Sequence, residues 1–170
     1  GIENGHLSFL LFRSIISVSD EYRAPILETA RCAVLTPQLP ALKKEKSQMN
    51  ILMIESSPHK HGSSNLLASE WMRGATEAGH KVQIFDAARA SLHPCIACDV
   101  CGMAGPCVHK DDMARLQEAL LASDMVVFVT PLYYFGMSAQ LKTVIDRFYS
   151  FNGKLSAKRL KSALIAAAWE

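Results

Sequence analysis

Four short, largely apolar runs occur in residues 49–170, and their regular spacing limits the architectures that this chain can adopt. The runs span residues 51–54, 82–85, 125–130 and 163–168. Helices are expected between them, over residues 64–78, 111–121 and 138–149. Strands that are apolar on both faces are typical of a parallel sheet covered by helices on both sides. The sequence therefore predicts an α/β, doubly wound parallel sheet.

Residues 1–48 have a different character. An apolar run over residues 7–18 is followed by three prolines and by a charged stretch over residues 43–46. We expect an N-terminal extension and linker here, with the folded unit, residues 49–170, beginning near Met49. The apolar run holds Arg13 and is shorter than the roughly 20 residues that a membrane-spanning helix needs. With no basic leader before it, we expect a cytoplasmic protein without a membrane span.

Composition excludes several classes of function. Apolar residues make up 49% of the chain, which suits a globular core, and the net charge is only +2, from 18 basic and 16 acidic side chains. A charge of this size does not predict a basic surface for binding nucleic acid. No G-x-S-x-G motif surrounds a serine, so a hydrolase is disfavoured.

The loop after the first apolar run carries the clearest binding signal. It is rich in hydroxyl and amide side chains and opens directly into the first predicted helix, whose N-terminal N–H groups attract anions. It is neither G-x-G-x-x-G nor a Walker motif, so a monophosphate fits better than a dinucleotide or nucleoside triphosphate. A serine-rich loop that merely caps a helix is the alternative. The candidate residues are Ser57, Ser63, Ser64 and Asn65, with added positive charge from His59 and Lys60.

The loop after the third apolar run, residues 130–138, is aromatic. Tyr133, Tyr134 and Phe135 are adjacent and precede Gly136. Exposed aromatic side chains at the end of a sheet suit a flat aromatic ligand, or alternatively the surface of a neighbouring subunit. Both are compatible if the ligand lies at a dimer interface.

Four of the five cysteines form one cluster. Cys95, Cys98, Cys101 and Cys107 have the spacing C-x2-C-x2-C-x5-C. Three closely spaced thiolates and a fourth nearby favour a [4Fe-4S] cluster, since zinc sites more often pair two separated C-x2-C units. Free thiols or an occasional disulfide remain the alternative.

The serine-rich and aromatic loops together resemble those of the flavodoxin-like NADPH-dependent FMN reductase family, over residues 49–169. The resemblance implies an FMN site, although Ser56 and His59 stand where the family often has Gly and Arg. The residues implied near the FMN phosphate are Ser57, His59, Ser63, Ser64 and Asn65, and those implied near the flavin ring are Pro131, Leu132, Tyr133, Tyr134, Phe135 and Gly136.

A flavodoxin-like sheet has five strands, whereas the apolar runs of this chain supply four. We therefore expect the fifth strand and the C-terminal helices to be absent. Either the chain is a fragment, or the absent edge is supplied by residues 1–48 or by a partner subunit.

The cysteine spacing is similar to that of the iron-sulfur flavoproteins, a branch of the same family. This resemblance implies an FMN-dependent oxidoreductase that passes electrons between FMN and a [4Fe-4S] cluster, with NAD(P)H as a possible donor. It also implies small-molecule or protein electron donors and acceptors, and a homo-oligomer with the flavin near an interface. An NAD(P)H-dependent FMN or quinone reductase without a metal cluster is the first alternative, and a non-catalytic binding module is the second. No catalytic residue is assigned.

Overall fold

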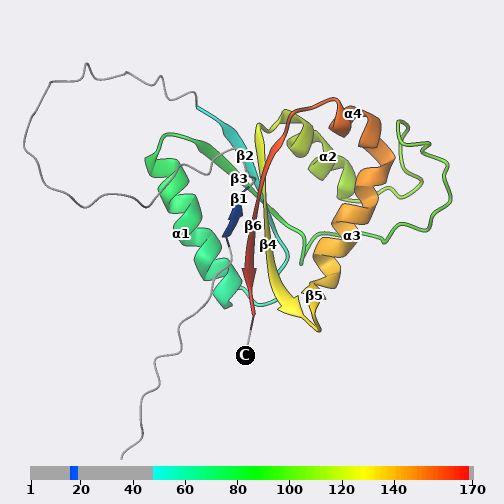
Figure 1. The fold of residues 1–170 in the computed structure, drawn as a ribbon. Helices are drawn as coiled ribbons and strands as arrows, with labels where there is room; N and C mark the ends of the chain where they lie inside the picture. Colours follow the sequence, from blue (N-terminus) through cyan, green and yellow to red (C-terminus); the bar gives the residue numbers. More distant parts are fainter. Residues whose placement is uncertain (1–15, 19–47, 169–170) are drawn as a thin grey trace, which may run out of the picture.

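A single sheet with the strand order β1-β6-β4-β2-β3 forms the centre of the molecule (Figure 1). The computed structural model describes residues 16–18 and 48–168. Four strands run parallel, and β1 pairs antiparallel with β6. The strands of this order are β1 (Ile16–Val18), β2 (Asn50–Glu55), β3 (Lys81–Asp86), β4 (Met125–Tyr133) and β6 (Lys161–Ala167), while β5 (Gly136–Met137) pairs with the end of β4. The predicted doubly wound α/β fold is confirmed.

Helices cover both faces of the sheet. Figure 1 shows α1 on one side and α2, α3 and α4 on the other. Their bounds are α1 (Ser63–Glu77), α2 (Met113–Ala122), α3 (Ala139–Arg147) and α4 (Asn152–Ser156), with a 3-10 turn, η2 (Phe148–Phe151), between the last two. The three predicted helices are present with shifted ends. Among the described residues, no helix is long and apolar enough to pass through a bilayer.

The sheet divides the core into two layers, as the interior strand β2 shows. Leu52 and Ile54 pack with the cluster beneath α2 and α3, whereas Ile51 and Met53 pack with the cluster beneath α1. All four side chains are buried. Successive residues of a strand point to opposite faces, so an uninterrupted apolar run is what a strand covered on both sides requires.

The edge beside β6 is occupied by part of the N-terminal segment. Ile16, Ser17 and Val18 pair with Ile165, Leu164 and Ala163. The sequence left open whether this edge would be covered by residues 1–48 or by a partner, and the structure places β1 there. The strand was not predicted, because a three-residue pairing inside a longer apolar run has no sequence signal of its own. Residues 1–15 and 19–47 of the predicted extension, including Cys32, lie outside the described residues.

Candidate functional site

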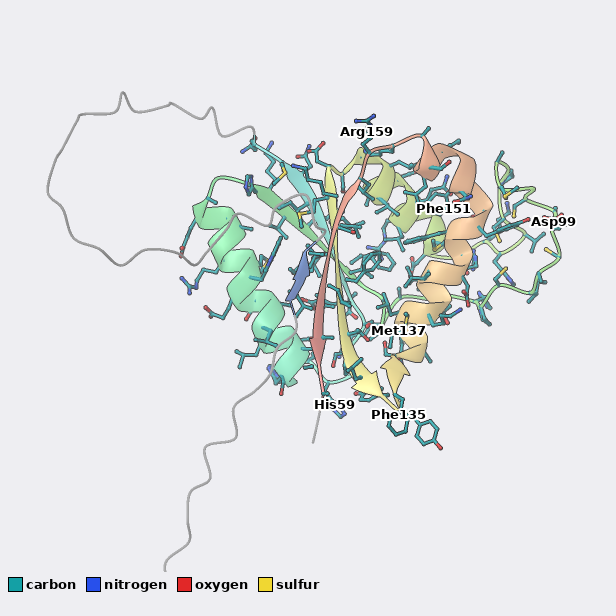
Figure 2. All side chains as sticks on the ribbon, viewed as in Figure 1. His59, Asp99, Phe135, Met137, Phe151 and Arg159 are labelled. Atoms are coloured by element: carbon teal, nitrogen blue, oxygen red, sulfur yellow. The ribbon has the colours of Figure 1, made fainter. Side chains whose placement is uncertain are left out.

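Two of the predicted loops leave the sheet at the same edge. β2 and β4 are neighbouring parallel strands, with Ile51 opposite Met125 and Glu55 opposite Val129. Their carboxyl ends therefore lie together, as the ligand-binding ends of such sheets do. Figure 2 shows His59, from the first loop, and Phe135, from the second, at this end of the molecule. We call residues 56–65 and 130–138 the carboxyl-edge loops.

A buried network of hydroxyl groups joins the two carboxyl-edge loops. Ser56 Oγ donates to the Val129 carbonyl at 2.7 Å, and Ser138 Oγ lies 2.9 Å from Ser56 Oγ. The Ser138 N–H donates to Thr130 Oγ1 at 3.0 Å. Ser138 Oγ also accepts from the Leu141 N–H and so caps α3. Because these groups are fully buried, their hydrogen bonds hold one loop at a set position relative to the other.

The first loop presents the N-terminus of α1. Gly62 is the residue before the helix, and among the described residues no side chain caps it by a hydrogen bond. The first turn of α1 also carries no acidic residue, as far as the described chain shows. Ser57 and Ser64 are buried, while His59 and Ser63 are exposed. An uncapped helix N-terminus flanked by hydroxyl groups fits the phosphate of FMN.

Asn65 offers an acceptor in this arrangement. Its Nδ2 donates to the Lys60 carbonyl at 3.4 Å, and its buried Oδ1 has no hydrogen-bond partner in the described part of the chain. An amide oxygen accepts hydrogen bonds, so this orientation suits a hydroxyl group of a ligand better than a phosphate oxygen.

The second loop is a tight β-hairpin whose aromatic tip faces solvent. Leu132 pairs with Met137 and Tyr133 with Gly136. The two turn residues between them, Tyr134 and Phe135, have φ values of 46° and 65° and are 97% and 100% exposed. Positive φ at both central positions is the type I′ turn, which normally carries Asn and Gly. Aromatic residues in this strained turn are typical of a binding surface. Two further predicted flavin contacts lie near the end of β4, where Pro131 is buried and Leu132 is exposed.

The cysteines lie in a long loop between β3 and α2, which we call the cysteine loop (residues 93–111). Figure 2 shows Asp99, at its far end, on the outer side of α3 and well away from His59 and Phe135. The two ends of the loop meet at a neck. There, Asp111 Oδ2 accepts from the His93 N–H at 3.0 Å, and the rings of His93 and His109 stack with their centroids 5.1 Å apart.

All four predicted cysteines line one cavity of about 500 Å³. They are free thiols, and Cys101 and Cys107 are less exposed than Cys95 and Cys98. The C-terminal end of α3 and the following turn form the opposite wall, through residues that include Arg147 and Tyr149. Tyr149 donates from its hydroxyl to Asp99 Oδ1 at 2.8 Å and fastens the tip of the loop to this wall.

The loop backbone repeatedly enters the left-handed region. Ala97, Asp99 and Met103 have φ values of 53°, 55° and 62°, and Gly102 has a φ of 49°. For residues other than glycine this costs about 1–2 kcal/mol each. Left-handed residues beside ordinary ones turn successive N–H groups toward a common concavity, an arrangement found around anions and iron-sulfur clusters. The four thiols and the backbone N–H groups of the loop thus fit a [4Fe-4S] cluster.

The cysteine side chains do not form a single-ion site. In residues 16–18 and 48–168, no group of three or more His, Cys, Asp or Glu side chains is arranged to hold a metal ion. Zinc binds four ligands at one atom, whereas a cubane takes one cysteine at each of four irons and so needs ligands spread around a larger volume. Thiols distributed around one cavity suit the second arrangement better than the first.

A buried ion pair holds the neck of the cysteine loop against α3. Arg147 donates from NH1 to Asp111 Oδ2 at 2.8 Å and to the His93 carbonyl at 2.7 Å, and from NH2 to Asp111 Oδ1 at 3.1 Å. Both side chains are 1% exposed. Burial alone would raise the pKa of Asp111, but hydrogen bonds from Arg147, His93 and Met113 hold that pKa well below its usual range. Asp111 therefore stays ionised and fastens both ends of the loop to one helix.

Sequence reasoning missed Arg147, His93 and His109 as parts of a site. One signal was available, because Arg147 follows Leu141 and Val144 on the buried face of α3. A charged residue on such a face implies a buried partner. The predicted helix over residues 111–121 begins two residues later than expected. The helix begins at Met113, Asp112 Oδ2 accepts from the Ser91 N–H, and Asp111 mainly pairs with Arg147.

The comparison with protein families identifies the family to which the chain belongs. Residues 49–168 match the model of the NADPH-dependent FMN reductase family. The chain belongs to this family, and the predicted resemblance is confirmed.

Relatives with assigned names point to one branch of that family. An iron-sulfur flavoprotein of Methanocaldococcus jannaschii is 32% identical over 99 residues, which cover 58% of this chain and 51% of the relative. An iron-sulfur flavoprotein of Archaeoglobus fulgidus is 29% identical over 110 residues, which cover 65% and 50%. The chain thus spans about half the length of these curated relatives.

A solved structure supports the same fold. The NAD(P)H:quinone oxidoreductase from Methanothermobacter marburgensis superposes with a TM-score of 0.55 at 21% identity, over 62% of this chain and 55% of that one. This likeness is one of fold.

Proposed function

We propose that this chain acts as an NAD(P)H-dependent flavin oxidoreductase that passes electrons between FMN and a [4Fe-4S] cluster held by Cys95, Cys98, Cys101 and Cys107. The observation that carries the proposal is the presence of two separate sites in one domain. One is a phosphate-type loop joined to an aromatic hairpin, and the other is a cavity lined by all four clustered cysteines. The names of the iron-sulfur flavoprotein relatives support the pairing.

The carboxyl-edge loops would hold FMN. The uncapped N-terminus of α1, together with Ser57, Ser63 and Ser64, would bind the phosphate, and exposed His59 would add charge when protonated. Asn65 Oδ1 would accept a hydrogen bond from a ribityl hydroxyl. The hairpin from Pro131 to Gly136 would lie against the flavin ring. When bound, FMN accepts a hydride and releases electrons singly, and a [4Fe-4S] cluster carries one electron at a time.

The exposed hairpin tip favours a homo-oligomer with the flavin near an interface. Two fully exposed aromatic side chains are costly to leave in water, and both flavins and neighbouring subunits cover such surfaces. The partners would otherwise be a small-molecule or protein electron donor and acceptor in the cytoplasm. Light scattering of the FMN-loaded protein, compared with a Tyr134→Ser/Phe135→Ser variant, measures this directly. A monomeric FMN complex would contradict it.

The test of the central proposal is the visible absorption spectrum, with iron and sulfide assays, of protein purified without oxygen. We expect a flavin band and an additional broad absorbance that bleaches on reduction. Cys98→Ala should lose the iron and keep the flavin, whereas Ser69→Ala, on the exposed face of α1, should keep both.

A second candidate is an NAD(P)H-dependent FMN or quinone reductase without a cluster. The observation that favours it is the match of residues 49–168 to a family whose description, NADPH-dependent FMN reductase, names the flavin and the nicotinamide donor and no cluster. Flavin without iron in anaerobically prepared protein would support this candidate and exclude the first. Protein that binds neither FMN nor iron would instead support a non-catalytic binding module.

A further inference from the structure

One buried polar atom on the wall of the cysteine cavity is unaccounted for by the fold. Arg147 uses NH1 and NH2 on Asp111 and on the His93 carbonyl, but its Nε–H is buried and has no hydrogen-bond partner in the described chain. A guanidinium carries five N–H donors in a fixed fork, and a buried donor without a partner is destabilising. Such a group in a folded protein calls for a hydrogen-bond partner from outside the described chain.

The surroundings of that atom point to sulfur as the partner. Arg147 and all four cysteines line the same cavity. A second buried atom without a partner among the described residues, His109 Nε2, belongs to a side chain of the same lining.

We propose that Arg147 is a positioning residue of the cysteine site, in which Nε–H donates to a sulfur of the cluster or of its cysteine ligands while the other two nitrogens hold the neck of the loop. This inference rests on the proposed function. In this arrangement each part of the guanidinium has one role. The NH1 and NH2 fork sets where the two ends of the cysteine loop lie, and the Nε side faces what the loop binds.

A hydrogen bond from a buried cation to cluster sulfur has a predictable electronic effect. Reduction adds negative charge to the cluster, so a nearby positive donor stabilises the reduced form and raises the reduction potential. Removing only the donor should lower the potential. Removing the negative charge of Asp111, while leaving Nε–H in place, should move the potential in the opposite direction.

The test therefore compares two variants of the iron-loaded protein, Arg147→Lys and Asp111→Asn. Lysine keeps the positive charge and loses the planar fork and its Nε–H, whereas Asn keeps the shape of Asp111. We expect Arg147→Lys to have a more negative cluster potential than wild type, and Asp111→Asn a less negative one. We also expect Arg147→Lys to lose iron to a chelator about tenfold faster than wild type. Substitutions of residues that hydrogen-bond to metal ligands commonly have effects of this size.

The control is Arg73→Lys. Arg73 pairs with Glu70 and Glu77 on the exposed surface of α1, on the opposite face of the sheet (Figure 1). It should match wild type in potential and in iron loss. If Arg147 only braces the loop, Arg147→Lys should leave the cluster potential at the wild-type value, and this result would overturn the inference.

A measurement on wild-type protein covers the case in which Arg147→Lys does not fold. Arg147 is the one arginine among the described residues that lines the cavity. In protein labelled with 15N only at arginine, the reduced cluster should show a weak 15N coupling by pulsed electron-nuclear double resonance. No coupling would overturn the inference while leaving the proposed function intact. Wild-type protein without iron would overturn both.

Discussion

The carboxyl-edge loops and the cysteine loop obtain their shapes in different ways. The carboxyl-edge loops begin at the ends of two paired strands, and buried hydroxyl groups of Ser56 and Ser138 join them. The cysteine loop has no regular secondary structure; the buried ion pair between Arg147 and Asp111 holds its neck, and the hydrogen bond from Tyr149 to Asp99 holds its tip. The sheet therefore supplies most of the geometry of the first site, whereas a few side chains supply that of the second.

This difference predicts unequal sensitivity to mutation. A site positioned by paired strands keeps most of its geometry when one contact is removed, because the strand pairing remains. A loop whose neck is held by a buried ion pair loses that anchor when either charge is removed, and the remaining charge is then buried without a partner.

The largest effect is expected at the neck. Asp111→Asn should lower the free energy of unfolding by about 3 kcal/mol near neutral pH, because it leaves Arg147 buried beside a neutral group. Urea unfolding of the iron-free protein measures this loss. A loss below 1 kcal/mol would mean that the ion pair does not anchor the loop.

The dependence of stability on pH provides a control for the ion pair between Asp111 and Arg147. The pKa of Asp111 is lower in the folded protein than in the unfolded chain, so its contribution is complete above the ordinary value near 4 and falls as pH decreases below it. The stability gap between wild type and Asp111→Asn should therefore narrow below pH 4. A gap that stays constant down to pH 2 would contradict the charge assignment.

The next effect is expected inside the cysteine loop. A Cβ at Gly105 would lie 3.0 Å from the backbone oxygen of Cys101, so Gly105→Ala must displace the backbone that carries a predicted ligand. We expect about tenfold weaker retention of iron, which is about 1.4 kcal/mol. Chelator competition measures it.

Gly74→Ala is the matched control for Gly105→Ala. Nothing in the described structure lies within 4 Å of a Cβ at Gly74, which sits inside α1. This change should keep the iron and stabilise the protein by up to about 1 kcal/mol. Equal iron retention in the two variants would show that the loop tolerates displacement.

A smaller effect is expected where the carboxyl-edge loops meet. Ser138→Ala removes the N-cap of α3 and the contact with Ser56, and should cost about 1 kcal/mol of stability. FMN affinity, measured by flavin fluorescence quenching, should fall by less than tenfold because β2 and β4 still align the loops. Complete loss of FMN binding would show that the hydroxyl network, and not the sheet, sets this site.

The smallest change in stability is expected at the hairpin tip, and it should have the opposite sign. Replacing Tyr134 and Phe135 by Asn and Gly removes backbone strain at two positive φ values and should stabilise the protein by about 0.5–1 kcal/mol. If the aromatic rings contact the flavin, FMN affinity should fall at the same time. Tyr134→Phe, which keeps a ring, should leave affinity unchanged, and undiminished FMN binding in the Asn-Gly variant would exclude the ring contact.

The sequence by itself determined the parallel sheet. Runs such as residues 51–54 are apolar at every position because a strand covered on both faces buries every side chain, and this requirement is local and visible in the chain. The cysteine cluster was equally visible, because its four members lie within a short segment and their spacing alone allows them to converge.

Only the tertiary structure decided which distant groups surround those motifs. Asp111 and Arg147 are 36 residues apart and meet because α3 packs beside the neck of the cysteine loop. Likewise, Ser56 and Ser138 meet across 82 residues because β2 and β4 are neighbours, and β1 reaches β6 from the far N-terminal segment. Such pairings depend on how helices and strands pack, and a pattern of local spacing carries no information about them.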